Sequence, residues 1–367
     1  MRIVGIDVFQ PTYRLLDGKY AWSNEHFVTE FTTTIVRVQT DQGIVGWGEV
    51  CPLGPAYMGA YARGVPAGIA EVAPAILGED PLQIGPLNDR MDYALSGHNY
   101  AKSPIDMALW DILGKASGLP VCALLGGQYV DDFAPYRAIS QDSPVGMAAS
   151  VRKYRKEGYR KFQLKVGGDW QEDVDRIHAC REVLEPGDIL VADANTGWLS
   201  HEAIKVANAV AELDVYIEQP CHNLEECARV RNATPLPFVV DEIILGVPEL
   251  LRAHDAIGMD VVNLKISRLG GLTKARRVRD LATQLGLAMT LEDSWGGDIT
   301  TAAIAHLVAS TRPENYFSAT DFNSYNDVRV AGGTPRRKGG LVPVPSGPGL
   351  GIEVEESLLG EPVRLSA

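Results

Sequence analysis

Residues 161–193 read KFQLKVGGDWQEDVDRIHACREVLEPGDILVAD. Two short apolar runs, 161–166 and 189–193, flank an amphipathic stretch, 169–184, whose apolar residues have helical spacing. A strand, a helix and a second strand in this order are typical of a unit in which the two strands lie parallel. The segment therefore predicts an α/β fold built on a parallel sheet.

The same alternation of strand and helix patterns continues along the chain on both sides of this segment. Further helical patterns cover residues 200–213 and 272–285. We predict eight strands, at Ala134–Ile139, Lys161–Val166, Ile189–Asp193, Val215–Glu218, Phe238–Asp241, Val261–Lys265, Ala288–Glu292 and Tyr316–Ala319. Eight such units favour a closed (β/α)8-type barrel over an open doubly wound sheet.

The N-terminal part of the chain has a different pattern. Alternating apolar runs predict strands at 3–9, 32–38 and 44–49, a long loop covers 14–27, and helices are expected at about 62–77, 83–93 and 104–117. The last helix is expected to begin at Pro104, because proline is favoured in a first turn. We predict an α+β domain over residues 1–127, the barrel over 128–330, and a C-terminal segment, 331–367, that returns to the N-terminal domain.

Composition limits the classes of partner. The 367 residues carry 34 Lys and Arg against 47 Asp and Glu, a net charge of −13, which argues against binding to nucleic acid. The five cysteines are scattered without a CxxC pair, so neither a disulfide framework nor a zinc ribbon is expected. The chain has no apolar run of about 18 residues and no secretory pattern, so we expect a cytoplasmic protein with no membrane partner.

The chemistry is expected where the barrel strands end, because barrel enzymes place their active sites there. Five consecutive predicted strands end in a charged residue: Lys165, Asp193, Glu218, Asp241 and Lys265. One acid alone is as readily explained by a salt bridge or a helix cap. Three acids at one barrel mouth instead predict a site for a hard divalent cation such as Mg²⁺, with positions left for water or substrate.

The two lysines suggest acid–base chemistry beside that metal. A cation that binds a substrate carboxylate stabilises the enediolate formed when the α-proton leaves, and a nearby lysine of lowered pKa can act as the base. A non-catalytic barrel that binds an amino acid or a metal is the alternative from another class. A binding protein needs the three acids to hold its ligand but does not need two bases, Lys165 and Lys265, so an enzyme is favoured.

The motifs around these residues resemble the enolase superfamily, specifically its muconate-lactonizing-enzyme-like branch. They are Gln163-Leu164-Lys165-Val166-Gly167, Asp193-Ala194-Asn195, Glu218-Gln219-Pro220, Asp241-Glu242 and Lys265-Ile266-Ser267-Arg268-Leu269-Gly270-Gly271. The resemblance implies Mg²⁺ held by Asp193, Glu218 and Asp241, with Lys165 and Lys265 as acid–base residues. The branch usually has Lys-x-Lys on the second strand, and Gln163 replaces the first of these lysines here.

The resemblance also implies that the N-terminal domain caps the barrel. Residues 14–27 and about 50–60 are then loops that close over its mouth. Tyr20, Trp22 and Tyr57 are candidates for substrate contact, although packing between the two domains explains each of them equally well. Related proteins often assemble, so a homo-oligomer is expected.

Within the superfamily, residues 97–103 and 293–298 resemble a group that acts on proline derivatives. Its two activities are dehydration of cis-3-hydroxy-L-proline and 2-epimerisation of hydroxyproline betaine or proline betaine. The resemblance implies that the betaine epimerases have a Trp near the end of the eighth strand, where an aromatic face suits a quaternary ammonium. This chain has Thr320 and Asp321 there, and a carboxylate suits the N–H groups of an unmethylated imino acid.

These features favour dehydration of cis-3-hydroxy-L-proline to Δ1-pyrroline-2-carboxylate, with the betaine epimerase as the alternative. The α-proton and the hydroxyl lie on opposite ring faces, so an anti-elimination uses two opposed acid–base groups. Two opposed lysines serve epimerisation equally well, and either can face the α-proton. Further substrate-binding candidates are Asp293, Trp295, Asn195 and Gln163, beside Asp321 and Thr320.

Overall fold

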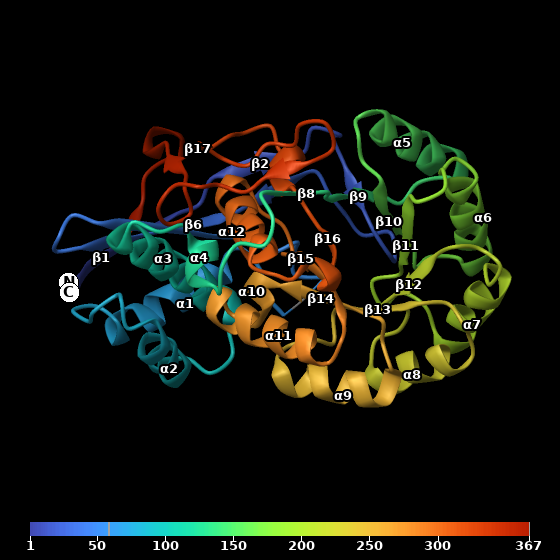
Figure 1. Ribbon diagram of the computed structural model, residues 1–367, viewed down its shortest axis with the longest axis horizontal. Helices are drawn as coiled ribbons and strands as arrows, with labels where there is room; N and C mark the ends of the chain where they lie inside the picture. The colour runs from blue at the N-terminus through green and yellow to red at the C-terminus, as the bar shows by residue number, and fades with distance from the viewer. Residues whose placement is uncertain (58, 367) are drawn as a thin grey trace.

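The computed structural model describes residues 1–57 and 59–366. Its main sheet has eight parallel strands that lie side by side in chain order, as predicted. They are β9 (Tyr136–Ile139), β10 (Lys161–Lys165), β11 (Ile189–Asp193), β12 (Tyr216–Glu218), β13 (Phe238–Val240), β14 (Val261–Lys265), β15 (Ala288–Glu292) and β16 (Tyr316–Ala319). The sheet curls into a near-closed barrel (Figure 1). The predicted fold class is therefore confirmed.

Helices connect successive strands around the outside of the barrel (Figure 1). They are α5 (Pro144–Lys156), α6 (Trp170–Arg181), α7 (Ser200–Ala209), α8 (Leu224–Asn232), α9 (Val247–Ile257), α11 (Leu272–Gln284) and α12 (Asp298–Ala309), with a single turn, α10 (Ile266–Leu269), directly after β14. Ser143, Asp169 and Asn223 accept hydrogen bonds from the first turns of α5, α6 and α8 and so fix where these helices begin. None of the helices described is long and apolar enough to cross a membrane.

The N-terminal part forms a four-stranded antiparallel sheet with helices packed on it. The strand order is β20 (Val363–Ser366), β1 (Ile3–Phe9), β6 (Thr34–Thr40) and β7 (Val45–Val50), so the end of the chain pairs with its beginning. The helices are α1 (Gly64–Val72), α2 (Ile84–Ala94) and α3 (Asn99–Ser117), and a turn, α4 (Val121–Leu124), leads toward the barrel. Gly48 lets β7 approach α3, because a Cβ there would lie 1.9 Å from the Pro104 carbonyl oxygen.

Two local predictions differ from the structure. Helix α3 begins at Asn99 and not at Pro104. Pro104 has no N–H, so the Tyr100 carbonyl, in the first turn of the helix, lacks one hydrogen bond, and the helix tolerates this loss. Residues 14–27, predicted as a loop, carry short strands. The short strands of the molecule are β2 (Thr12–Arg14), β3 (Tyr20–Ala21), β4 (Phe27–Val28), β5 (Glu30–Thr32), β8 (Asp132–Phe133), β17 (Ala331–Gly332), β18 (Val342–Pro343) and β19 (Glu353–Val354).

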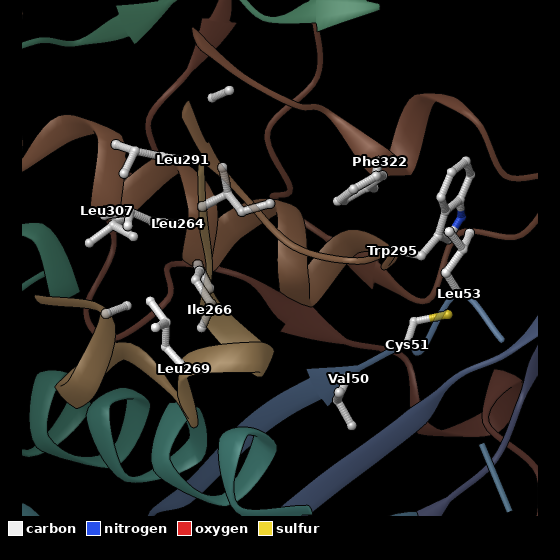
Figure 2. Packing of buried hydrophobic residues seen from close by; sticks show 14 of the residues in the cluster. Val50, Cys51, Leu53, Leu264, Ile266, Leu269, Leu291, Trp295, Leu307 and Phe322 are labelled. Atoms are coloured by element: carbon white, nitrogen blue, oxygen red, sulfur yellow. The ribbon is translucent and has the colours of Figure 1, made fainter. Parts of the chain in front are cut away.

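The N-terminal part covers the carboxyl end of the barrel through apolar contacts. Figure 2 shows Cys51 and Leu53, which follow β7, beside Trp295, which follows barrel strand β15. The Trp295 ring is stacked on Phe31 with 4.4 Å between ring centroids and lies 5.0 Å from the ring of Tyr20. The barrel mouth is therefore closed by aromatic side chains that come from both parts of the chain.

Candidate active site

The strand register brings the five predicted charged residues to one level of the barrel. Lys165 of β10 pairs with Asp193 of β11, which pairs with Glu218 of β12. Asp241 follows β13 directly, and Lys265 ends β14. All five side chains are buried. Because β10 and β14 are four strands apart in an eight-stranded barrel, the two lysines approach the mouth from opposite sides.

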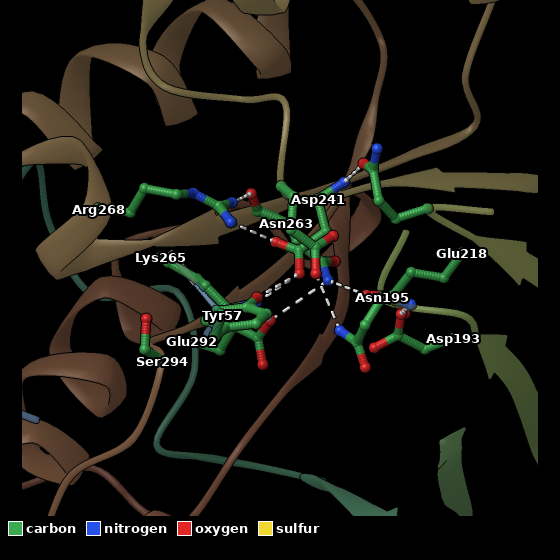
Figure 3. Close-up of polar contacts among 12 residues, drawn as sticks. Tyr57, Asp193, Asn195, Glu218, Asp241, Asn263, Lys265, Arg268, Glu292 and Ser294 are labelled. Carbon is green, nitrogen blue, oxygen red and sulfur yellow. Dashed lines mark hydrogen bonds and ion pairs between the residues drawn. The ribbon is translucent and has the colours of Figure 1, made fainter. Parts of the chain in front are cut away.

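Each of the three carboxylates has a positively charged or amide partner, and Figure 3 shows Asp241 beside Lys265 and Arg268. Asp193 is ion-paired with Lys165, while Asp241 is paired with Lys265 and, at 2.8 Å, with the Arg268 Nη1. Glu218 accepts hydrogen bonds from amide nitrogens: Gln163 Nε2 at 2.9 Å and Asn263 Nδ2 at 2.5 Å. The carboxylate charge is thus shared among neighbours on β10 and β14 and in α10.

The charges shift the pKa values of the site in opposite directions. Burial, together with Asp193 and Asp241, raises the pKa of Glu218 well above its ordinary value. Burial acts in the same sense on Asp241, but Arg268 and Lys265 outweigh it and lower that pKa. Burial lowers the pKa of each lysine, yet the carboxylates, Asp193 for Lys165 and Asp241 for Lys265, outweigh it and the net pKa is raised. The lowered lysine pKa that the sequence suggested is therefore not found in this arrangement.

The donor chemistry of the three acids suits a hard divalent cation. They supply carboxylate oxygens from adjacent strand ends, and all three side chains are buried. Among residues 1–57 and 59–366, no three His, Cys, Asp or Glu side chains are gathered closely enough to hold a metal as they stand. The reason is the pairing above, in which each carboxylate is turned toward Lys165, Lys265 or the two amides. The residues fit Mg²⁺, provided that these oxygens turn inward.

A small cavity of about 20 Å³, called the catalytic cavity below, lies against both lysines. Of the sequence candidates, its walls include Tyr20, Tyr57, Gln163, Lys165, Asn195, Lys265, Asp293 and Trp295. Tyr57 makes the most direct contact: its hydroxyl accepts a hydrogen bond from Lys265 Nζ at 2.8 Å and donates one to Asp241 Oδ2 at 3.2 Å. The capping part thus contributes a side chain that touches an acid–base candidate.

Two candidates in this cavity are held by well-defined hydrogen bonds. Asp293 accepts from the backbone N–H groups of Ser267 and Ser294 at 3.0 and 2.7 Å and from the Ser267 hydroxyl. Burial raises the pKa of Asp293 to about 7. Asn195 adopts a left-handed conformation with φ of 42°, donates to Glu242 Oε1 at 2.9 Å, and accepts no hydrogen bond at its own Oδ1 from the described part of the chain.

The structure does not bring Asp321 into the site. Both of its carboxylate oxygens accept from the Tyr159 hydroxyl, at 2.9 and 3.0 Å, and Arg337 of the C-terminal segment lies 3.4 Å away. These partners hold the carboxylate outside the catalytic cavity, so the expected contact with a substrate ammonium is not supported. Trp22, which is stacked on His26, and Thr320 also lie outside the walls of that cavity.

Sequence reasoning did not select three polar residues of the site. Glu292 ends β15, accepts a hydrogen bond from the Tyr136 hydroxyl and lies 3.2 Å from Lys265. Its position as the last residue of a strand was the signal available for it. Arg268 follows Lys265 by one turn of α10, and Asn263 precedes Lys265 by two residues on the same face of β14.

These features define a class of protein: a parallel-barrel enzyme with buried lysines and carboxylates at the mouth and an α+β part that covers them. Residues 23–126 match the mandelate racemase/muconate lactonizing enzyme N-terminal domain, and residues 146–358 match the enolase C-terminal domain-like family. The chain belongs to the mandelate racemase/muconate lactonizing enzyme family of the enolase superfamily.

Individual relatives extend over the whole chain. A cis-3-hydroxy-L-proline dehydratase from Roseibium aggregatum is 55% identical over 363 residues, which is 99% of each protein. An N-succinyl-L-Arg/Lys racemase from Bacillus cereus is 28% identical and covers 91% of this chain and 90% of its own. A crystal structure of a mandelate racemase/muconate lactonizing enzyme from Roseovarius nubinhibens has a TM-score of 0.96 and 41% identity, covering 100% of this chain and 99% of that one.

Proposed function

We propose that this protein dehydrates cis-3-hydroxy-L-proline to Δ1-pyrroline-2-carboxylate. The observation that carries the proposal is the pair of buried lysines on opposite strands, β10 and β14, facing one small cavity. The 55% identity over the whole chain to a protein named for this activity supports the choice of substrate.

The reaction needs one base and one acid. One lysine takes the α-proton, and the electrons of that C–H bond pass through the enediolate of the substrate into the new Cα–Cβ double bond. The Cβ–O bond breaks, and the other lysine gives its proton to the hydroxyl, which leaves as water. The resulting enamine tautomerises to the cyclic imine. Lys165 and Lys265 fill these two roles because the leaving groups lie on opposite ring faces.

Asp193, Glu218 and Asp241 are the residues that would hold Mg²⁺. When bound, the ion would supply positive charge that stabilises the enediolate and would replace Lys165 and Lys265 as the partners of Asp193 and Asp241. A structure from Roseovarius nubinhibens that is 34% identical to this chain is described as complexed with magnesium, which supports this assignment. A lysine released from Asp193 or Asp241 loses the charge that raises its pKa most, while burial still acts to lower that pKa and so favours its role as base.

For the substrate itself, we propose that Asp293 faces the secondary ammonium, in place of Asp321. Asn195 and Gln163 contribute polar contacts, and Tyr20, Tyr57 and Trp295 form the walls around the ring. All six of these residues line the catalytic cavity, which supports the assignment.

The alternative is a 2-epimerase of hydroxyproline betaine or proline betaine. The two opposed lysines serve that reaction equally well, because one removes the α-proton and the other returns a proton to the opposite face. The racemase from Bacillus cereus among the relatives supports this second candidate.

One experiment separates the two functions. The protein with Mg²⁺ is incubated in D₂O with cis-3-hydroxy-L-proline, trans-4-hydroxy-L-proline betaine, proline betaine and L-proline, and each mixture is followed by proton NMR. Dehydration predicts loss of the cis-3-hydroxy-L-proline signals and growth of an imine product. Exchange of the α-proton of a betaine without loss of water indicates the epimerase, and no change in any mixture refutes both.

Other features stay proposals. We propose a cytoplasmic, homo-oligomeric protein divided into a capping domain (1–127), a catalytic barrel (128–330) and a C-terminal segment (331–367) that returns to the cap. The five cysteines, all unpaired and buried in the structure described, support a reducing compartment.

A further inference from the structure

A buried carboxylate of the capping part reaches the first turn of a barrel helix. Glu49 lies near the end of β7 and is fully buried. Its Oε1 accepts a hydrogen bond from the Gly297 backbone N–H at 3.0 Å, and its Oε2 accepts one from the Thr300 backbone N–H at 2.9 Å. These two donors stand at the start of α12, where the backbone N–H groups of a helix have no partner within the helix.

Helix α12 cannot cap its own start, because Gly297, the residue directly before it, has no side chain. The carboxylate of Asp298, in the first turn, accepts instead from the backbone N–H groups of Val330 and Ala331. In a capping box, side chains bind the N–H groups of the residue before the helix and of the third helical residue. Glu49 binds both of these positions, so the capping part supplies the cap, and its negative charge suits the helix dipole.

The surroundings of Glu49 are built to hold a carboxylate. The Tyr13 hydroxyl donates to Oε1 at 2.9 Å, and the Thr33 hydroxyl lies 3.0 Å from the same oxygen. A carboxylate only accepts hydrogen bonds, whereas a glutamine amide would turn an NH₂ group toward some of these donors. Tyr13 also packs closely on the start of α12, because a Cβ at Gly297 would lie 2.6 Å from its hydroxyl.

This cap ends a short loop that forms part of the catalytic cavity. Residues 293–297 connect β15 to α12, and Asp293 and Trp295 of this loop line the cavity beside the lysines. The loop is held at its first residue, where Asp293 accepts from the Ser267 N–H at 3.0 Å, and at its last residue by Glu49. The position of both cavity residues therefore depends on a side chain that lies outside the cavity.

We propose that Glu49 is a positioning residue that sets the affinity of the site for substrate, because it holds Asp293 and Trp295 in place through the start of α12. The inference rests on the proposed function, in which these two residues contact the ammonium and the ring of the substrate. Both lysines stand on other strands, β10 and β14. Loss of the cap should therefore weaken substrate binding more than it slows the chemical step.

The test replaces Glu49 by glutamine, which keeps the size of the side chain. Glu30→Gln is the matched control, because Glu30 is an exposed glutamate on β5 of the same capping part. Steady-state kinetics with cis-3-hydroxy-L-proline and Mg²⁺ give KM and kcat. Titration calorimetry gives the Kd of pyrrole-2-carboxylate, an unreactive carboxylate with a five-membered ring. For Glu49→Gln we expect KM and Kd to rise about tenfold with kcat within about threefold, and for Glu30→Gln no change in either.

A second variant acts on the same junction from the helix side if Glu49→Gln fails to fold. In Gly297→Ala, the new Cβ meets the Tyr13 hydroxyl, so the start of α12 must shift away from Glu49 and KM should again rise with kcat nearly kept. A purely structural role would lower stability in urea and leave KM and Kd unchanged in the folded variants.

That outcome overturns the role of Glu49, as does a loss of kcat with KM unchanged. If the wild type neither dehydrates cis-3-hydroxy-L-proline nor binds pyrrole-2-carboxylate, the proposed function falls and the role of Glu49 falls with it. Turnover by the wild type, together with an unaltered KM in the variants, refutes the role of Glu49 only.

Discussion

Lys165→Met is the substitution whose consequences follow most directly from the structure. Lys165 is the ion-pair partner of Asp193, which is fully buried, and the remaining hydrogen bond that Asp193 accepts comes from the Asn195 backbone N–H at 2.8 Å. The methionine keeps an unbranched apolar side chain, one atom shorter, and removes the ammonium with its charge and its N–H donors. Asp193 is then left as a buried carboxylate without a cation.

Removing one partner of a buried ion pair costs about 3–5 kcal/mol of folding free energy. We therefore expect Lys165→Met to lose about that much stability in EDTA. Mg²⁺ should restore part of it, since a ligand at 100 times its Kd stabilises the folded state by about 2.7 kcal/mol. With Mg²⁺ present, turnover should fall by about 10²–10⁴, because the acid–base group is gone.

Urea unfolding with EDTA and with saturating Mg²⁺ measures the stability, and the NMR assay measures turnover. Lys156→Met is the control, because Lys156 is an exposed lysine on α5 and its loss should change stability by no more than about 0.5 kcal/mol. A loss below about 1 kcal/mol for Lys165→Met in EDTA would refute the buried-pair reasoning. Turnover at the wild-type rate would refute the catalytic role.

Further predictions test the cavity, the packing and the pH response. In steady-state kinetics, Asp293→Asn should lower kcat/KM at least tenfold, whereas Asp321→Asn should leave kcat/KM within threefold of the wild type, because Tyr159 and Arg337 already bind the Asp321 carboxylate. A larger loss of kcat/KM for Asp321→Asn than for Asp293→Asn would contradict this assignment. EDTA should abolish turnover and added Mg²⁺ should restore it, whereas full activity after exhaustive chelation would exclude the metal role. Gly48→Ala should destabilise the fold by about 1–3 kcal/mol in urea because its Cβ meets the Pro104 carbonyl, whereas Gly85→Ala, with nothing within 4 Å, should not. Burial lowers the pKa of His306 to about 4 from 6.5, so the unfolded chain binds the proton more readily and stability should fall by roughly 1.4 kcal/mol per unit as pH drops through that window. His306→Gln should flatten this slope in urea titrations at pH 4–7, and an unchanged slope would assign the effect to other groups.

The barrel could be predicted because its signal is repeated. Lys165, Asp193, Glu218 and Lys265 each end a short apolar run, and a parallel sheet carries such ends to one edge. The same reasoning fails for Asp321, which lies two residues beyond the end of β16. Its direction is set by Tyr159 and Arg337, partners that are distant in the sequence and reach it only through tertiary structure.

The electrostatics of the site were also beyond a sequence argument. A pattern of strand ends shows that lysines and acids share a barrel mouth, but not which of them are in contact. The sign of the lysine pKa shift depends on that contact, because burial and an adjacent carboxylate act in opposite directions. The burial of Glu292 beside Lys265 is another pairing that only the register of β14 and β15 reveals.

The pairing of β20 with β1 has a consequence for how the chain can be rearranged. Ser366 lies opposite Gly5, so the two termini are neighbours at one edge of the capping sheet (Figure 1). A short linker can therefore join them, and new ends can be opened at the exposed turn formed by residues 185–187, between α6 and β11. Such a circular permutant should fold to the same barrel with its capping part inserted between barrel segments, since the order of synthesis changes while the contacts away from the new ends are kept.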